Sequence, residues 1–290
     1  MTSSQPFFRF HSDSQSVLMS SHKPGSRNFS LSSWLIPVAV LLLMAGLWQG
    51  VVTFLVQMRG LNAGLFPGPM AVVEAGWRMR SDLGQATLLT AAAALTGLSL
   101  SILFGTATAF VFSQSSIVRR ALYPYAVLLQ TIPIIAIAQI VILTLGRGFQ
   151  SIVLVSCIIS LFPIITNTTT GLLQIDPDLV DLFRLNRATR RQLLVKLRLP
   201  SALPYLISGI QIASGSAIVG AIVGEFFLSA GPTGLGSLIQ GKVASFNMPE
   251  LCAVVVVATL LGTIVLGVVT VLGEWLLKGW YGMSLEGHGR

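Results

Sequence analysis

Long apolar runs dominate the pattern of hydrophobic and polar positions along this chain. Each run has the length of about 20 residues that a helix needs to cross the hydrocarbon core of a bilayer. Trp34 and Trp48 occur in the first run, and tryptophan is enriched where a span meets the membrane surface. The pattern predicts an all-α membrane protein with six transmembrane helices, at about residues 34–56, 86–112, 122–145, 151–173, 204–228 and 251–277.

Polar stretches divide the rest of the chain. Residues 1–33 are rich in Ser, and we expect a disordered cytoplasmic tail there, with a second cytoplasmic tail at 279–290. The transmembrane domain would then cover residues 34–278. After the first span, Phe66-Pro67-Gly68-Pro69 predicts an extended turn, because Pro fixes φ and restricts the residue before it. A short amphipathic helix at about 70–79 should follow.

Two features of the spans predict how they pack. Pro133 and Pro163 fall inside apolar runs, which membrane bundles tolerate when neighbouring groups satisfy the freed carbonyls. Small residues spaced four apart let helix backbones approach closely. In the second span these positions are Gly97, Ser101, Gly105 and Ala109.

Composition supports a membrane protein. The chain is 53% hydrophobic and 10% charged, with a mean hydropathy of +0.80, whereas soluble domains carry about 25% charged residues. Its net charge of +8 could attract nucleic acid. Basic cytoplasmic loops facing anionic lipid explain the charge better, so we expect membrane lipid and no nucleic acid as a partner. Cys157 and Cys252 lie in apolar runs and are interpreted as small buried hydrophobes.

The Lys and Arg residues predict the orientation. With six spans, thirteen of the 18 fall on the side of the termini. The other five are Arg59, Arg78, Arg80, Arg147 and Lys242. Because positive residues concentrate in cytoplasmic loops, both termini should lie in the cytoplasm.

Catalytic chemistry is missing from the sequence. His11, His22 and His288 all lie in the tails, which excludes an intramembrane Ser–His dyad, and every Asp lies outside the spans. There is no HExxH pattern, Cys/His cluster or GxxxxGK[ST] pattern. We therefore expect no catalytic residue, no metal site, no cofactor and no enzyme activity.

Ion-coupled carriers usually place charged residues in mid-span. Here only Glu225 and Glu274 come close, and both sit near span ends. A self-sufficient secondary transporter or channel remains the alternative, but any energy for transport should come from another subunit.

The basic loop at about 176–203 predicts two short helices. Asp176 before Pro177 is typical of a helix start, and apolar residues recur at helical spacing up to Leu185. A second amphipathic stretch follows Thr189, and we expect Pro200 to end it. Such a hairpin could lie on the inner leaflet. Its mixture of Asp and Arg with protruding Leu and Phe favours docking into a groove on a partner protein.

This loop resembles the cytoplasmic coupling loop of the permease subunits of binding-protein-dependent ABC importers. Asp181-Leu182-Phe183 occupy the positions of the family's Glu-Ala-Ala run, Ala188-Thr189 those of its Ala-Ser, and Leu199-Pro200 those of its Leu-Pro. Arg187 stands where the family generally has Gly. Because Gly allows a positive φ at the turn, Arg187 must adopt a different turn or bear strain.

Other segments resemble the nitrate/sulfonate/taurine/bicarbonate-type subgroup of these permeases, and together they cover most of the chain. They are Leu65–Pro69, Leu129–Pro133, Phe162–Thr168, Gly220–Phe226 and Gly234–Gly236. The resemblance implies a type I importer permease in the bacterial inner membrane. Its expected partners are an ABC ATPase subunit that supplies energy, a periplasmic or lipid-anchored solute-binding protein, and a second permease copy in a homodimer.

The resemblance also implies which residues couple ATP hydrolysis to transport. Leu182, Phe183 and Leu185 would form the apolar anchor, with Arg184 and Arg187 as ionic partners. The full set of coupling residues is Asp181, Leu182, Phe183, Arg184, Leu185, Arg187, Ala188, Thr189, Leu199 and Pro200.

A translocation path needs polar groups to compensate a solute for lost water. The candidates are Gln130, Thr131, Gln139, Thr166, Asn167, Ser214, Ser216 and Glu225. Ser, Thr and Asn also commonly bond between helices, which is the structural alternative. Glu225 could contact the binding protein, gate the outer mouth or pair with a cation at the helix end. Nitrate, sulfonate, taurine, bicarbonate and vitamin-precursor substrates all stay open.

Overall fold

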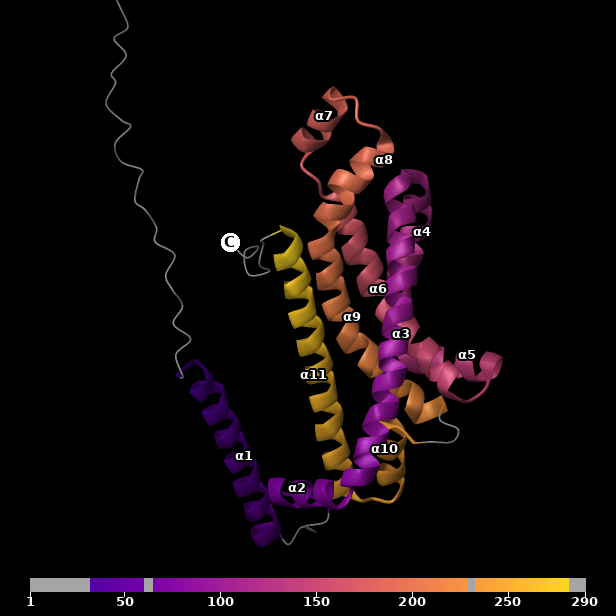
Figure 1. Ribbon diagram of the computed structural model, residues 1–290. Coiled ribbons are helices and arrows are strands. Elements are labelled where there is room, and N and C mark those ends of the chain that lie inside the picture. The colour runs from indigo at the N-terminus through magenta and orange to yellow at the C-terminus, as the bar shows by residue number, and fades with distance from the viewer. Residues whose placement is uncertain (1–31, 60–64, 229–232, 282–290) are drawn as a thin grey trace, which may run out of the picture. The chain divides into compact units, whose positions relative to one another are not determined.

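The computed structural model describes residues 32–59, 65–228 and 233–281 (Figure 1). Within these ranges the chain is helical with short connections and contains no strand, so the expected all-α class is confirmed. The tails expected at 1–33 and 279–290 lie almost wholly outside the described residues. The chain divides into two compact units, residues 1–47 and 48–290. Helix α1 (Ser32–Arg59) belongs to both units, and the other helices all belong to the second.

Five helices in the described ranges are long and apolar enough to cross a membrane. They are α1, α3 (Arg80–Gln114), α6 (Phe149–Leu173), α9 (Leu199–Leu228) and α11 (Met248–Tyr281). Each contains one of the predicted spans and several extend beyond it. The short helix expected after the Pro-rich turn is α2 (Pro69–Arg78), and α10 (Leu235–Ala244) precedes α11.

The span expected at 122–145 is not one continuous helix. It consists of α4 (Ser116–Leu129) and α5 (Ile134–Leu145), which are separated at Gln130–Pro133. Pro133 cannot donate a backbone hydrogen bond, and it disfavours helical geometry at the residue before it. At 1.5 Å per residue neither helix alone reaches the thickness of the hydrocarbon core, about 30 Å.

Helices α3, α6 and α9 form the centre of the second unit. Small residues on α3 meet α6: a Cβ atom at Gly97 would lie 2.5 Å from Ser156 Oγ, which leaves room for glycine alone. One turn further on, the Ser101 hydroxyl donates to the carbonyl of Cys157 at 2.7 Å. Gly97, Ser101, Gly105 and Ala109 are all buried, which confirms the predicted close packing of this face.

The contact between α6 and α9 follows the same rule. Ser156 donates to the carbonyl of Ala217 at 2.9 Å. A Cβ atom at Gly220 would lie 2.8 Å from Ser156 Cα, so the two backbones touch there. In lipid, helices gain little from the hydrophobic effect and associate through such packing and interhelical hydrogen bonds.

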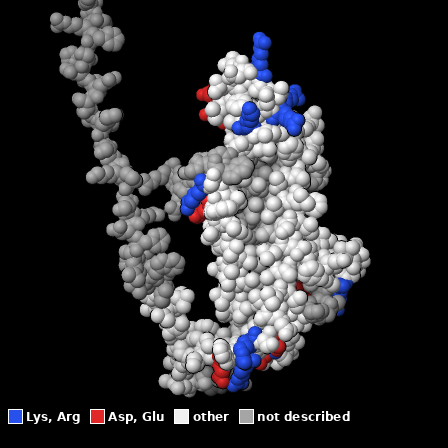
Figure 2. All heavy atoms as spheres, viewed as in Figure 1, with Lys and Arg blue, Asp and Glu red and all other residues white. Residues whose placement is uncertain are grey.

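The charged side chains of the second unit gather toward its two ends. Figure 2 shows blue and red atoms near both ends of the visible face, with a broad uncharged surface between them. The ribbon in Figure 1 places the segment of α7 (Pro177–Leu185) and α8 (Arg190–Leu193) beyond one end of α6 and α9. Helices α2 and α10 lie at the opposite end. An apolar belt between polar ends is the pattern of a membrane-spanning bundle.

Two glycines of α9 give a matched test of this packing. We expect Gly220→Ala to lower the free energy of unfolding by about 1 to 3 kcal/mol, because the new methyl group overpacks against α6. Gly215→Ala is the control, since a Cβ atom there meets nothing within 4 Å. Thermal unfolding in detergent measures both variants. An equal effect of the two substitutions would contradict the close contact at Gly220.

Candidate functional site

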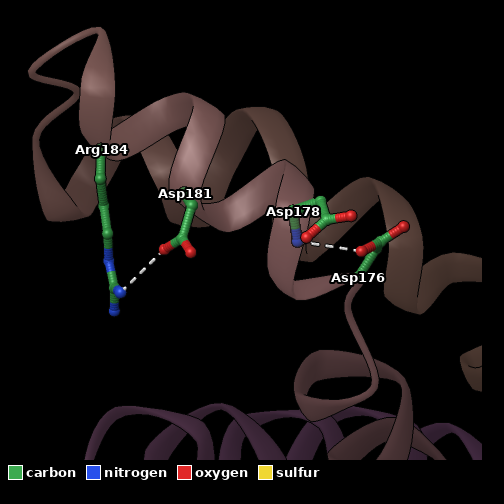
Figure 3. A network of polar contacts seen from close by, with 4 residues as sticks. All are labelled: Asp176, Asp178, Asp181 and Arg184. Atoms are coloured by element: carbon green, nitrogen blue, oxygen red, sulfur yellow. Dashed lines mark hydrogen bonds and ion pairs between the residues drawn. The ribbon is translucent and has the colours of Figure 1, made fainter. Parts of the chain in front are cut away.

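Helix α7 begins as the sequence predicts. The Asp176 carboxylate accepts a hydrogen bond from the backbone N–H of Asp178 at 2.9 Å, and Pro177 occupies the first helical position (Figure 3). Arg184 and Asp181 form an ion pair at 3.1 Å on the exposed side of the helix. Such an exposed pair contributes about 0.5 kcal/mol or less. The N-terminal cap is therefore the stronger local constraint.

The turn after α7 is a Schellman motif. The N–H of Ala188 donates to the carbonyl of Phe183 at 3.0 Å, and the N–H of Arg187 donates to that of Arg184 at 2.9 Å. Arg187 occupies the left-handed position with φ of +51°. It thus keeps the turn that usually contains Gly and bears the strain, which costs about 1 to 2 kcal/mol.

Helix α8 starts at a capping box between Thr189 and Gln192. The chain then passes without interruption through a π-helical turn, η1 (Leu194–Arg198), into α9. The prediction that Pro200 ends this helix was wrong. The N–H of Leu199 bonds to the carbonyl of Leu194, five residues back, so the hydrogen-bond register has already shifted just before the proline that lacks an N–H.

The coupling residues differ in their exposure. Leu185 is 81% exposed and Leu182 is 53% exposed, so these two members of the predicted anchor are free to contact a partner. Phe183, the third, is half-buried beside the turn, as is Ala188. Pro200 is half-buried as well. The remaining coupling residues are all exposed: Asp181, Arg184, Arg187, Thr189 and Leu199.

Two of the translocation-path candidates come together. Gln130, at the break between α4 and α5, and Ser216, on α9, line one cavity of about 230 Å³. Phe162 and Pro163 of α6 form part of the same wall. The break in the expected span and the proline of α6 thus meet around a single hollow.

The remaining path candidates do not share this cavity. Several of them bond to carbonyls on or next to their own helix: Thr131 to Leu128, Thr166 to Phe162, Asn167 to Pro163 and Ser214 to Gln211. Ser216 also donates to Ile212, at 3.2 Å. Gln139 is exposed on α5. A role for these residues in transport stays a prediction.

Glu225 is 2% exposed and lies in a network that joins three helices. Its Oε2 atom accepts from the Thr90 hydroxyl of α3 and from the backbone N–H of Gly236, each at 2.8 Å. The N–H of Leu235 donates to the Thr90 hydroxyl at 2.9 Å. In the described ranges no Lys or Arg pairs with Glu225, so backbone and hydroxyl donors satisfy this carboxylate.

Glycines make room for the carboxylate. A Cβ atom at Gly234 would collide with the Glu225 carboxylate, and one at Gly236 would collide with the carbonyl oxygen of Ile222. The segments 220–226 and 234–236 therefore meet in space. Sequence reasoning missed Thr90, because a single threonine in an apolar helix gives no sign of a distant partner.

Residues 97–279 match the family described as the inner membrane component of binding-protein-dependent transport systems. The chain belongs to this family. It is the transmembrane permease of an ABC importer, and this membership covers most of the central helices described above.

Several permeases of known systems are similar to this one. The riboflavin transport system permease protein RibX of Chloroflexus aurantiacus is 34% identical over 247 residues, covering 84% of this permease and 89% of the relative. The formylaminopyrimidine transport permease protein ThiX of Halalkalibacterium halodurans is 36% identical over 204 residues, covering 68% and 79%. A bicarbonate transport system permease protein, CmpB of Synechocystis, is 31% identical over 180 residues, covering 62% and 58%.

A solved structure confirms the expected fold. One chain of the inward-facing MetNI methionine ABC transporter superposes with a TM-score of 0.59 and 18% identity, covering 70% of this permease and 97% of that chain. At this identity the likeness concerns the fold alone, which is that of a type I importer permease.

The bridging hydroxyl of Thr90 can be tested by its isostere. Thr90→Val should lower the free energy of unfolding by about 1 to 3 kcal/mol, because it leaves the buried N–H of Leu235 without its partner and weakens the contacts of Glu225. Thr87→Val is the matched control on the same helix, since that hydroxyl bonds only the carbonyl of Leu83. Thermal or chemical unfolding of the purified permease measures the stability of both variants. A similar loss of unfolding free energy in Thr90→Val and Thr87→Val would contradict the network.

Arg187 gives a test of the strained turn. Arg187→Val should increase hydrogen exchange of the amides at 187 and 188, because a β-branched side chain fits a positive φ poorly. Arg187→Gly should leave their protection equal or raise it, since glycine adopts this conformation freely. Mass-spectrometric exchange over residues 176–193 measures both, and greater opening in the glycine variant would be the contrary result.

Proposed function

We propose that α7 and the turn after it dock an ABC ATPase subunit, whose hydrolysis of ATP drives import of a small solute through this permease. A solute-binding protein outside the membrane would deliver that solute. The observation that carries the proposal is a short helix that stands beyond the bundle and exposes Leu182 and Leu185. Exposed leucines on a helix suit insertion into an apolar groove of a partner.

The local structure of this segment suits the transmission of force. Its ends are fixed by the Asp176 cap, the Schellman turn and the capping box at Thr189. From Arg190 the helix continues through η1 to the far end of α9, where Glu225 bonds to the start of α10. A displacement of the docking segment would therefore be carried along one helix to the opposite end, as rigid-body switching requires.

For the solute we propose a small uncharged or weakly charged heterocycle of the vitamin-precursor type. The side chains that line the cavity at Gln130 and Ser216 carry no formal charge, and Phe162 offers an aromatic face. Such a lining can bond to amide or ring groups and stack on a ring, but it gives no counter-charge to an anion. The higher identity to RibX and ThiX than to CmpB agrees with this choice.

The surface of the bundle supports a membrane location and a second permease copy. Large apolar side chains of α11, such as Ile264, Val271 and Trp275, are exposed in the single chain. In a bacterial inner membrane they would contact lipid or the partner copy of a homodimer. Docking of the ATPase at α7 would put that end of the bundle in the cytoplasm, and we propose that both termini face the cytoplasm as well.

The docking proposal is tested with the permease and its co-purifying ATPase in nanodiscs. Leu185→Asp should reduce solute-stimulated ATP hydrolysis about tenfold or more, because the charge cannot enter an apolar groove without large cost. Leu185 is so exposed that the substitution should leave insertion and thermal stability unchanged.

Leu185→Met is the conservative control and should keep the stimulation. Unaltered stimulation in Leu185→Asp would refute docking at this residue. Uptake by the permease alone, driven by an ion gradient, would instead establish the alternative of a secondary transporter or channel.

A further inference from the structure

A second cavity, of about 320 Å³, lies between α4 and α6 near the end of the bundle that carries the docking segment. Helix α4 contributes Arg119, Arg120, Tyr123 and Pro124, and α6 contributes Thr169 and Leu173 among others. This volume lies at the lower limit of about 300 to 1,000 Å³ typical of ligand sites. It is separate from the hollow at Gln130 and Ser216.

The two arginines of this cavity have no protein partner among the described residues. Neither guanidinium forms an ion pair or a hydrogen bond there, although other charged residues of the permease do. Arg119 is half-buried, which makes an unpaired charge more costly than at an open surface. Each guanidinium presents five N–H donors in a planar fork that matches a phosphate group.

The surroundings of the arginines are amphipathic. Arg120, Pro124 and Leu128 follow one another at intervals of four and so lie along one face of α4, and Leu128 is 55% exposed. Tyr123 adds a ring to the cavity wall, and Leu173 adds an apolar side chain from α6. A ligand with an anionic head at the arginines and an apolar body along α4 would satisfy both parts of this surface.

The position of the cavity favours a membrane lipid over a soluble anion. Its arginines lie in the first turns of α4, and its Leu173 is the last residue of α6, just before the docking segment. The cavity is therefore close to the charged end of the bundle, the level at which headgroups are found. Basic pockets between transmembrane helices on the cytoplasmic side are suited to anionic headgroups. Placing this end in the cytoplasm rests on the proposed function.

We propose that the cavity is a specific site for the phosphate group of an anionic glycerophospholipid. Arg119 and Arg120 bind the phosphate, Tyr123 and Leu173 bound the headgroup, and an acyl chain runs along the exposed face at Leu128. A lipid held in this way bridges α4 to α6 directly before the connection to α7. The bilayer thereby contributes to fixing the segment from which the docking helix projects.

The experiment measures lipid binding to the purified, delipidated permease, without ATPase or ATP. Phosphatidylglycerol should raise the unfolding temperature and remain bound in native mass spectrometry, whereas phosphatidylcholine and inorganic phosphate should not. The double variant Arg119→Gln/Arg120→Gln should weaken the apparent affinity for phosphatidylglycerol about tenfold or more, as expected for two lost charges at an anionic surface.

Two further variants separate a site from general charge attraction. Leu173→Trp keeps the charge but fills the cavity, and it should also reduce binding. Arg147→Gln removes one exposed charge from the connection between α5 and α6, away from the cavity, and should bind as the unaltered permease does.

Equal binding by all variants would overturn the proposal, as would a full stabilising effect of inorganic phosphate alone. Loss of binding in the double arginine variant together with normal binding in Leu173→Trp would refute binding inside the cavity. It would indicate general attraction of the lipid to the two positive charges instead. Because the assay contains no nucleotide and no solute, its failure leaves the docking proposal untouched, and failure of the Leu185 test leaves the lipid site untouched.

Discussion

The close approach of α3, α6 and α9 is the constraint on which the rest of the structure depends. In a bilayer these helices cannot be driven together by burying apolar surface, because the lipid is equally apolar. They are held by backbone contacts at Gly97 and Gly220 and by the hydroxyls of Ser101 and Ser156. This rigid centre fixes where the cavity at Gln130 can form and where Glu225 can reach across to α10.

Segments that resemble the importer subgroup contact one another in pairs in the folded chain. The break at Gln130–Pro133 and Pro163 of α6 meet around one cavity of about 230 Å³. The segments at 220–226 and 234–236 meet around a carboxylate, where glycines allow two helices to approach. The residues of each segment cannot be explained from that segment alone, because they contact a second segment that is distant in the sequence.

The fold class, five of the spans and the start of α7 follow from the sequence, because length, hydropathy and capping act locally. The exceptions have non-local or competing causes. Pro133 divides an apolar run that looks continuous, whereas Pro200 is absorbed by a π-helical turn that no residue pattern announces. Arg187 keeps a glycine's conformation because the hydrogen bonds on both sides determine the turn. The role of Thr90 could not be predicted from the sequence, because it depends on where Leu235 and Glu225 lie in the fold.

The π-helical turn η1 has a consequence for the angular setting of the docking segment. A π turn inserts one residue into a helix of 3.6 residues per turn, so everything before it is rotated by about 100° relative to everything after it. The π turn thus sets the angle between the face of α9 that packs on α6 and the side from which α7 projects. Gain or loss of a single residue here would turn the proposed docking surface by about 100° while the membrane bundle kept its contacts.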